Sequence, residues 1–444
     1  MRLDNLTFKG GFHAPDNKEL TSGKAIEKAN EPKIVYISLQ QHVGAPCEAL
    51  VKVGDKVKVG QKIGDSKAKV SAPVHSSVSG VVKSIKRLYT TTGIKSDCIE
   101  IESDGLNEMH ESIGNKLSLD KLSKEQIIER IREAGIVGLG GAGFPMHTKL
   151  VTSDDNSVDT VILNGSECEP YLTCDHRIML EEPEKVVTGL EIILKYLGLE
   201  DKNGYIAVED NKKDAIEVLK ALDKDNVKVQ VATCKTKFPQ GDSYRIVDSV
   251  TGRKVPQGGR CKDAGSLVSN VYTAFATAEA VLESKSLYER VVTVTGRGVK
   301  EPKNLLVKIG TTIGEVIEQC GGFNGKPGKI LSGGPMTGIA QFSLDTPIVK
   351  TTSGIVVLTE EEAKVEKVLP CIKCGKCVEI CPVHIEPLYI SAYALKDNME
   401  AAEKFNALAC ISCGSCSYVC PSKRPLTESI DHAKNEIKAR RKKS

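Results

Sequence analysis

The sequence lacks a long apolar run. Its start, MRLDNLTFKGGFH, contains no stretch of signal-peptide length, and no later segment approaches the ~20 apolar residues that a membrane-spanning helix needs. We therefore expect neither a secretory signal nor a membrane-spanning helix, and a protein that is soluble or peripheral to a membrane.

The sequence also lacks an excess of charge of either sign. It has 61 Lys and Arg against 58 Asp and Glu, a formal net charge of +3, which does not support nucleic-acid binding along the whole chain. Basic residues gather only at the end, in KNEIKARRKKS. We interpret this tail as a solvated terminus; contact with an acidic partner or an anionic membrane surface is the alternative.

A length of 444 residues corresponds to about three domains of ordinary size. Residues 31–118 begin with short, glycine-broken strands such as VKVGDKVKVGQKIGD, which resemble the barrel-sandwich fold of biotinyl and lipoyl carriers. A carrier would be modified on Lys67 or Lys69. Because SKAKV lacks the Met-Lys-Met type of turn, we expect an unmodified docking module without covalent biotin or lipoate.

Residues 119–285 alternate between helix and strand patterns. Ser123 and Gln126 form a capping-box signal before an apolar helical stripe. Strands are predicted at 160–163, 205–208 and 227–232, and helices near 182–196 and 213–222. This alternation predicts a mainly parallel sheet that binds its ligand at the carboxyl ends of the strands.

Residues 290–355 form a smaller module of strands, VVTVTGRGV and NLLVKIG, followed by a helix that begins at Thr312 with Glu315 as its capping-box partner. The charged stretch 360–367 predicts a linker to a last domain, residues 360–444.

Eight of the 15 cysteines form two runs of C-x2-C-x2-C-x3-C-P in this last domain. This is the run of bacterial two-cluster ferredoxins, in which the fourth cysteine of each run ligates the other cluster. Zinc, which prefers paired C-x2-C knuckles, is the alternative. Two 4Fe-4S clusters in a reducing cytoplasm are predicted, with ligands Cys371, Cys374, Cys377, Cys381, Cys410, Cys413, Cys416 and Cys420.

A glycine-rich string, GLGGAGFPMHTK at 138–149, lets the backbone approach a phosphate and point N–H groups at it. A plain tight turn is the alternative interpretation, since the string does not match a strict G-x-G-x-x-G. The string NGSECEP at 164–170 directly follows a predicted strand. Together these strings resemble the flavin and NADH site of the NADH-binding subunit of respiratory complex I.

The motifs along the rest of the chain indicate more closely which family it resembles. FKGGFHAPDNKELT near the start, the barrel-sandwich module, the glycine loop, LVSNVYTA at 267–274, GGPM at 333–336 and two ferredoxin runs are similar to the RnfC subunits of the Rnf complex, the ion-translocating ferredoxin:NAD oxidoreductase. The resemblance implies a multidomain α/β chain. Its parts would be an N-terminal segment (1–30), the barrel-sandwich module (31–118), a Rossmann-like FMN/NADH domain (119–285), a β-grasp-like module (290–355) and an α-helical two-cluster ferredoxin domain (360–444).

The resemblance also assigns site residues. The glycines of the loop would wrap the flavin, Lys149 would add a phosphate charge, and Glu169 would face the nicotinamide nucleotide with Phe144 near it. Cys168, inside NGSECEP, would lie beside the flavin. The implied FMN and NADH contacts are Gly138, Gly140, Gly141, Ala142, Gly143, Phe144, Lys149, Asn164, Ser166, Glu167, Glu169, Phe238, Gly241, Asp242 and Asn270.

The implied activity is exchange of hydride between NADH and FMN, followed by transfer of single electrons through the two clusters. Implied partners are the other Rnf subunits, including membrane subunits, with ferredoxin served indirectly, and the implied location is the cytoplasmic side of the cell membrane. Two other functions remain open: a soluble NADH-dependent adapter of the proline-reductase-associated type, and a ferredoxin-like relay without flavin.

Overall fold

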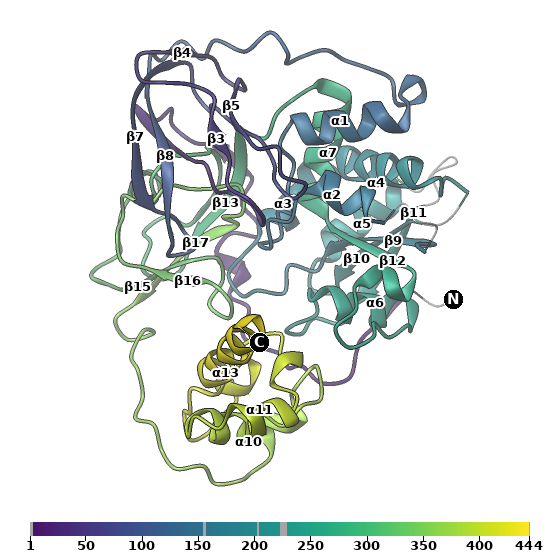
Figure 1. Cartoon of the computed structure of the whole chain (residues 1–444), viewed down its shortest axis with the longest axis vertical. Helices are drawn as coiled ribbons and strands as arrows, with labels where there is room; N and C mark the ends of the chain where they lie inside the picture. Colours follow the sequence, from purple (N-terminus) through teal and green to yellow (C-terminus); the bar gives the residue numbers. More distant parts are fainter. Residues whose placement is uncertain (1–2, 154–156, 202–203, 223–228, 444) are drawn as a thin grey trace.

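The computed structural model describes residues 3–153, 157–201, 204–222 and 229–443. Figure 1 shows a β-rich half beside an α/β half, with a helical C-terminal domain below both. Across these residues, no helix is both long and apolar enough to cross a membrane.

The first module consists of two small antiparallel sheets, one in the order β2-β8-β7-β4 and one in the order β3-β5-β6. Alternate residues of the paired strands β2 and β8, such as Val35, Ile37, Ile99 and Ile101, are fully buried between the sheets. This alternation is the reason for the Val/Lys pattern in the sequence. The strands are β2 (Ile34–Ser38), β3 (Glu48–Ala49), β4 (Lys56–Val57), β5 (Lys62–Asp65), β6 (Val74–His75), β7 (Gly80–Tyr89) and β8 (Lys95–Ser103).

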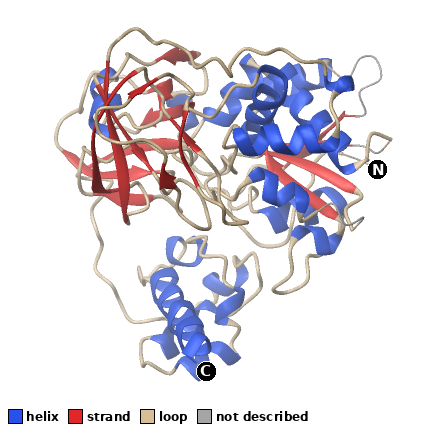
Figure 2. Cartoon of the chain, turned by 45° about the horizontal axis from the view of Figure 1, so that its top comes forward, coloured by secondary structure: helices blue, strands red, loops and turns tan. Residues whose placement is uncertain are grey.

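The α/β domain is built on a four-stranded parallel sheet in the order β11-β10-β9-β12, with helices on both faces (Figure 2). Its strands are β9 (Thr160–Gly165), β10 (Gly204–Glu209), β11 (Val229–Cys234) and β12 (Ser266–Asn270). The three predicted strands are confirmed in β9, β10 and β11, except that residues 227–228 lie outside the described part of the chain. The strand pattern did not identify β12.

The helices of this domain follow the predicted alternation. They are α1 (Lys124–Glu133), α2 (Met146–Val151), α3 (Cys174–Glu181), α4 (Pro183–Leu197), α5 (Lys213–Ala221), α6 (Ser243–Thr251) and α7 (Val271–Glu283). The capping box before α1 is confirmed: Ser123 Oγ accepts from the Gln126 N–H, and Gln126 Oε1 accepts from the Ser123 N–H at 2.9 Å.

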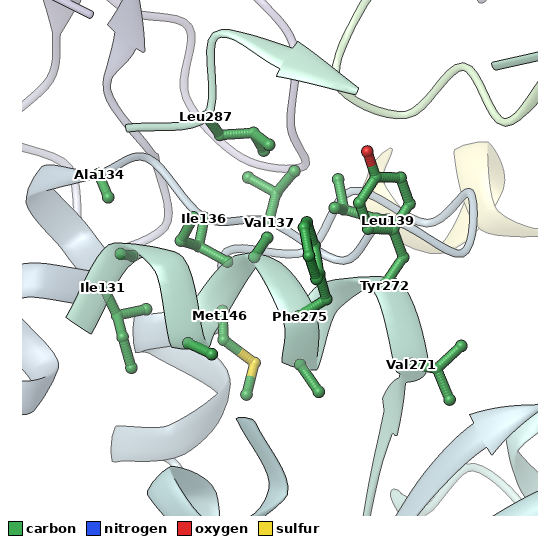
Figure 3. Close-up of a cluster of buried hydrophobic side chains, with 14 of the residues drawn as sticks. Ile131, Ala134, Ile136, Val137, Leu139, Met146, Val271, Tyr272, Phe275 and Leu287 are labelled. Carbon is green, nitrogen blue, oxygen red and sulfur yellow. The ribbon is translucent and has the colours of Figure 1, made fainter. Parts of the chain in front are cut away.

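A buried apolar cluster lies beneath the glycine-rich string. Figure 3 shows Leu139 and Met146 among residues of α7, including Tyr272 and Phe275. Leu139 is 1% exposed, and its N–H donates to Thr273 Oγ1 at 2.9 Å. The string is therefore anchored to α7 at a residue between its glycines.

The third module is a six-stranded mixed sheet in the order β1-β14-β13-β17-β15-β16. Its edge strand β1 belongs to the N-terminal segment and runs parallel to β14. The capping box of Thr312 and Glu315 is confirmed at the start of α8. The elements are β1 (Ile26–Lys28), β13 (Glu289–Thr295), β14 (Lys303–Lys308), α8 (Ile313–Gln319), β15 (Pro327–Ser332), β16 (Ile339–Gln341) and β17 (Gly354–Thr359).

The C-terminal domain is helical, with α10 and α13 packed around an apolar core of its own. The basic tail is helical, and its residues 438–441 are exposed, as expected of a solvated terminus. It continues α13, and Ile437 within it is buried because it packs on this core. The helices are α9 (Lys376–Glu379), α10 (Pro387–Ala394), α11 (Met399–Lys404), α12 (Ser415–Tyr418) and α13 (Leu426–Lys443).

Candidate functional site

A cavity of about 350 Å³ opens at the carboxyl ends of β9 and β12. Asn164 and Asn270, the neighbouring residues near the ends of these strands, line its floor. The hairpin tip Thr91–Thr92 of the first module and segments 332–338 and 351–353 of the third module supply other walls. A pocket of this size, at the strand ends of a parallel sheet, is the usual position and volume of a small-molecule site.

The glycine-rich string forms one wall of this cavity. The Gly138 N–H donates to Phe144 O at 2.9 Å and the Gly143 N–H donates to Gly138 O at 3.0 Å, which closes a compact loop. Gly141 has a φ of +105°, a conformation that favours glycine, and an added Cβ there would meet nothing within 4 Å. The loop therefore leaves open space beside its backbone at Gly141, one of the residues that line the cavity.

Two carboxylates also line the cavity, and each accepts a hydrogen bond from the backbone. Glu167 Oε1 accepts from the Asp175 N–H at 2.8 Å, at the first turn of α3. Glu169 Oε2 accepts from the Met336 N–H at 3.1 Å, and Glu169 also accepts from the Thr337 hydroxyl. Burial raises the pKa of Glu169.

Asp175 is a cavity residue that no sequence pattern predicted. Burial, reinforced by the charge of Glu167, raises the pKa of Asp175 to about 7. The glycine and NGSECEP strings end before it, and its only sequence signal is its position in the first turn of a helix.

Two buried lysines hold the NGSECEP loop by donating hydrogen bonds to its backbone carbonyl groups. Lys212 Nζ donates to Ser166 O at 2.6 Å, and Lys18 Nζ donates to Glu169 O at 2.9 Å. The Ser166 hydroxyl is buried and has no hydrogen-bond partner within the described structure. Neither lysine was singled out in the sequence, because each acts on backbone atoms distant along the chain.

A contact to the FPQGD segment closes the floor of the cavity. Asn164 Nδ2 donates to Gly241 O at 2.8 Å, and the Gly241 N–H donates to Cys168 Sγ at 3.2 Å. Gly241 and Cys168 both line the cavity, and the position of Cys168 beside a flavin stays a prediction.

The cavity does not gather every predicted residue. Seven line it: Gly140, Gly141, Asn164, Glu167, Glu169, Gly241 and Asn270. Gly138, Gly143 and Ser166 shape the adjoining loops. The side chain of Lys149 donates to Val268 O instead of pointing into the cavity.

Four more predicted residues do not line the cavity: Ala142, Phe144, Phe238 and Asp242. Phe238 is buried against Phe12 of the N-terminal segment. Asp242 caps α6 by accepting from the Tyr244 and Arg245 N–H groups, both at 3.2 Å. Ala142 is exposed and Phe144 half-buried on the glycine loop. Their roles toward a nucleotide stay predictions.

In the C-terminal domain, the fourth cysteine of each run lies near the first three cysteines of the other run. Cys371, Cys374 and Cys377 line one pocket together with Cys420, the last cysteine of the other run. In the second group, burial raises the pKa of Cys416 to about 12, and Cys410, Cys413 and Cys381 add to that rise. Four thiols at each position are the donor set that a 4Fe-4S cluster takes.

The second cysteine group lies next to the cavity. A Cβ added to Gly414 would lie 3.1 Å from Met336 O, and the N–H of the same Met336 holds Glu169. The N-terminal segment reinforces this junction, because Phe12 stacks on Tyr418 with ring centroids 4.6 Å apart. One residue, Met336, thus contacts both the cavity wall and a cluster loop.

Family models match all four parts of the chain: an RnfC barrel sandwich hybrid domain (residues 6–106), a Nuo51 FMN-binding domain (131–279), an SLBB domain (291–340) and a 4Fe-4S dicluster domain (370–424). The chain is 46% identical, over its whole length and that of the relative, to the C subunit of the Na⁺-translocating ferredoxin:NAD⁺ oxidoreductase complex of Acetobacterium woodii. The chain belongs to the RnfC family of Rnf complex subunits. The resemblance found in the sequence is therefore confirmed.

Another RnfC family member, the C subunit of the proton-translocating ferredoxin:NAD⁺ oxidoreductase complex of Clostridium ljungdahlii, is 47% identical over 98% of this chain and 94% of its own. Among solved structures, an NAD⁺-reducing [NiFe]-hydrogenase in the H2-reduced state matches with a TM-score of 0.51 and 16% identity, covering 73% of this chain and 62% of the hydrogenase chain. That likeness supports the fold alone.

The residues of this RnfC-family chain fit the cofactors of its family models. The open backbone beside Gly141, the side-chain amides of Asn164 and Asn270, and the cavity volume suit a flavin mononucleotide, and the two thiol groups suit two 4Fe-4S clusters.

Proposed function

We propose that the chain is the NADH-oxidising electron-transfer subunit of an Rnf-type ferredoxin:NAD oxidoreductase. The observation that carries this proposal is the contact of Met336 with both Glu169 of the cavity and Gly414 of a cysteine loop. A nucleotide site and an iron–sulfur site that share one residue are placed for electron exchange. When bound, FMN exchanges a hydride with NAD(H) and single electrons with the clusters.

The chain's own residues bind and orient these groups. The glycine loop with Asn164 and Asn270 holds the flavin, and Glu169, fixed by Met336 and Thr337, faces the nicotinamide nucleotide. No residue is required as a nucleophile. The proposed cluster ligands are Cys371, Cys374, Cys377 and Cys420 for one cluster and Cys410, Cys413, Cys416 and Cys381 for the other.

The finer architecture is part of this proposal. We take residues 119–285 as a Rossmann-like FMN/NADH domain, 290–355 as a β-grasp-like module, and 360–444 as the ferredoxin domain, after an N-terminal segment of 30 residues and the barrel-sandwich module. The chain would sit peripherally on the cytoplasmic side of the cell membrane. Its partners would be the other Rnf subunits, including those in the membrane, and ferredoxin would exchange electrons with it indirectly.

Anaerobic purification followed by iron and flavin counts and an NADH titration tests the proposal. We expect one non-covalent FMN, about eight iron atoms for two four-iron clusters, and faster bleaching of the flavin by NADH than by NADPH. A protein that binds iron but shows no flavin band would instead be a ferredoxin-like relay. Equal bleaching by the two nucleotides would contradict the preference for NADH.

A further inference from the structure

The first three cysteines of each run lie in a seven-residue loop, and the two loops have the same sequence except at two positions. Residues 371–377 read CIKCGKC and residues 410–416 read CISCGSC, so that Lys373 and Lys376 stand where the second loop has Ser412 and Ser415. The backbones agree: Lys373 and Ser412 both have a φ of +56°, and each donates its N–H to the first cysteine of its loop at 3.4 Å. The loop conformation therefore does not require the lysines.

The two cysteine loops differ in their exposure to solvent. Gly414 and Ser415 of the second loop face the interior, where Ser415 is 1% exposed and Gly414 abuts Met336. In the first loop Cys371 and Cys374 are exposed, and Ile372 between them is 68% exposed. The second cluster position thus lies against the nucleotide cavity, and the first lies at the surface of the protein.

Three cations border the exposed position. Lys373, Lys376 and Arg424 line the pocket of its four cysteines, and no carboxylate is among the described residues that line it. No ion pair is found for these three side chains within the described structure, whereas the neighbouring Lys423 pairs with Glu366 at 2.5 Å. We call Lys373, Lys376 and Arg424 the basic collar.

Exposed apolar side chains adjoin the basic collar. Val368 and Leu369 are 50% and 48% exposed, and the Leu369 N–H donates to Ser422 O at 2.9 Å, which holds this segment beside Arg424. Exposed aliphatic side chains next to unpaired cations are typical of a surface that binds another macromolecule.

We propose that the basic collar and its apolar neighbours dock the acidic surface of a one-electron carrier protein, so that electrons enter or leave this chain at the Cys371 cluster. The inference rests on the proposed function, because it takes both clusters to be present. Charge complementarity selects an acidic partner. A carrier protein fits better than an anionic membrane, because the collar lines the same pocket as two exposed cluster ligands, Cys371 and Cys374, and a bilayer accepts no electrons.

The matched variant is Lys373→Ser/Lys376→Ser, which gives the first loop the sequence of the second. Lys396→Ser/Lys438→Ser is the control, since it removes two exposed charges of the same domain away from the cysteine loops. The full-length protein, loaded with clusters, is reduced with dithionite, desalted, and mixed with oxidised flavodoxin, an acidic carrier, or with ferric cytochrome c, a basic one. Each carrier molecule takes one electron from a reduced cluster, and flavodoxin also takes one proton from water.

We expect the variant to reduce flavodoxin about tenfold more slowly than the wild type at low ionic strength, with the difference vanishing as salt is added. Its affinity for labelled flavodoxin, measured by fluorescence anisotropy, falls in parallel. Reduction of cytochrome c is not slowed, and the control variant behaves as the wild type.

Three results would overturn the docking proposal. Equal flavodoxin rates for variant and wild type would show that the collar does not dock an acidic carrier. Equal slowing with both carriers, together with a shifted cluster potential in a redox titration followed by electron paramagnetic resonance, would show that the lysines tune the cluster. Loss of binding to phosphatidylserine vesicles with unchanged flavodoxin kinetics would identify a membrane contact. A wild-type protein without iron would instead refute the proposed function itself.

Discussion

The side-chain amide of Asn270 donates to Asp175 Oδ2 with an N–O distance of 2.5 Å, which joins the N-cap residue of α7 to the first turn of α3. Asn270 Oδ1 accepts from the N–H groups of Tyr272 and Thr273, so its amide NH2 is the part that faces Asp175. With Glu167 nearby and water excluded by burial, the pKa of Asp175 rises to about 7. A carboxyl group that changes charge near neutral pH thus lies in the wall of the nucleotide cavity.

We expect Asp175→Asn to stabilise the flavin-free protein increasingly as pH rises. The folded pKa of Asp175 lies above the unfolded value of about 3.9, so the folded state binds the proton more tightly and the wild type loses stability between about pH 4 and 7. Asparagine carries no such charge. The gain over the wild type should exceed about 1 kcal/mol at pH 7.5 relative to pH 5.

Thermal unfolding midpoints of both proteins across this pH range measure the effect. Asp120→Asn, at an exposed position, is the control and should show no such trend. A difference between Asp175→Asn and the wild type that stays constant with pH would contradict the raised pKa.

Gly334→Ala should damage the nucleotide site without touching the clusters. A Cβ at this position would lie 2.2 Å from Glu169 Oε2 and 2.8 Å from Glu169 Cβ, so Glu169 must move and lose its bond to the Met336 N–H. Overpacking of this kind costs about 1–3 kcal/mol of stability. We also expect weaker NADH binding, measured by titrating the bleaching of the flavin, with an unchanged iron count.

Gly23→Ala is the matched control, because its Cβ would meet nothing within 4 Å. It should change neither stability nor NADH affinity. If Gly334→Ala bound NADH as tightly as the wild type, Glu169 would not contribute to NADH binding.

The sequence predicted those parts of the site that lie in short continuous strings. The glycine loop, the NGSECEP loop and the cysteine runs each place several functional atoms within about ten residues, so spacing alone reveals them. Thr91 and Ser353 reach the cavity by the packing of separate modules, and Asp175 reaches it from the first turn of α3, so none of the three belongs to a local pattern. The direction of a side chain is equally hidden: the string shows that Lys149 follows the loop, but not that its ammonium group turns to Val268 O.

We expect no biotinyl or lipoyl group on Lys67 or Lys69. The segment that carries them is tied down at its end, since Thr148 Oγ1 donates to Lys69 O at 3.0 Å and the Ala45 N–H donates to Val70 O at 3.0 Å. A swinging arm needs a free turn instead. Intact mass should equal that of the unmodified chain, and Lys67→Arg/Lys69→Arg should leave NADH oxidation with an artificial acceptor unchanged. An added mass on either lysine would restore the carrier interpretation.

Cys420→Ala should destroy the cluster of the first cysteine run and spare that of the second. Cys420 lines a pocket with Cys371, Cys374 and Cys377, while Cys381 lies near Cys413 and Cys416. The fourth cysteine of each run cannot reach the cluster of its own run, because it lies one residue beyond the spacing of the first three and the proline after it directs the chain away.

Electron paramagnetic resonance of the reduced protein compares Cys420→Ala with Cys371→Ala and Cys410→Ala. A Cys420→Ala spectrum that shows the loss seen in Cys410→Ala would establish ligation within each run. The flavin should remain reducible by NADH in all three variants, because its cavity is built from other modules.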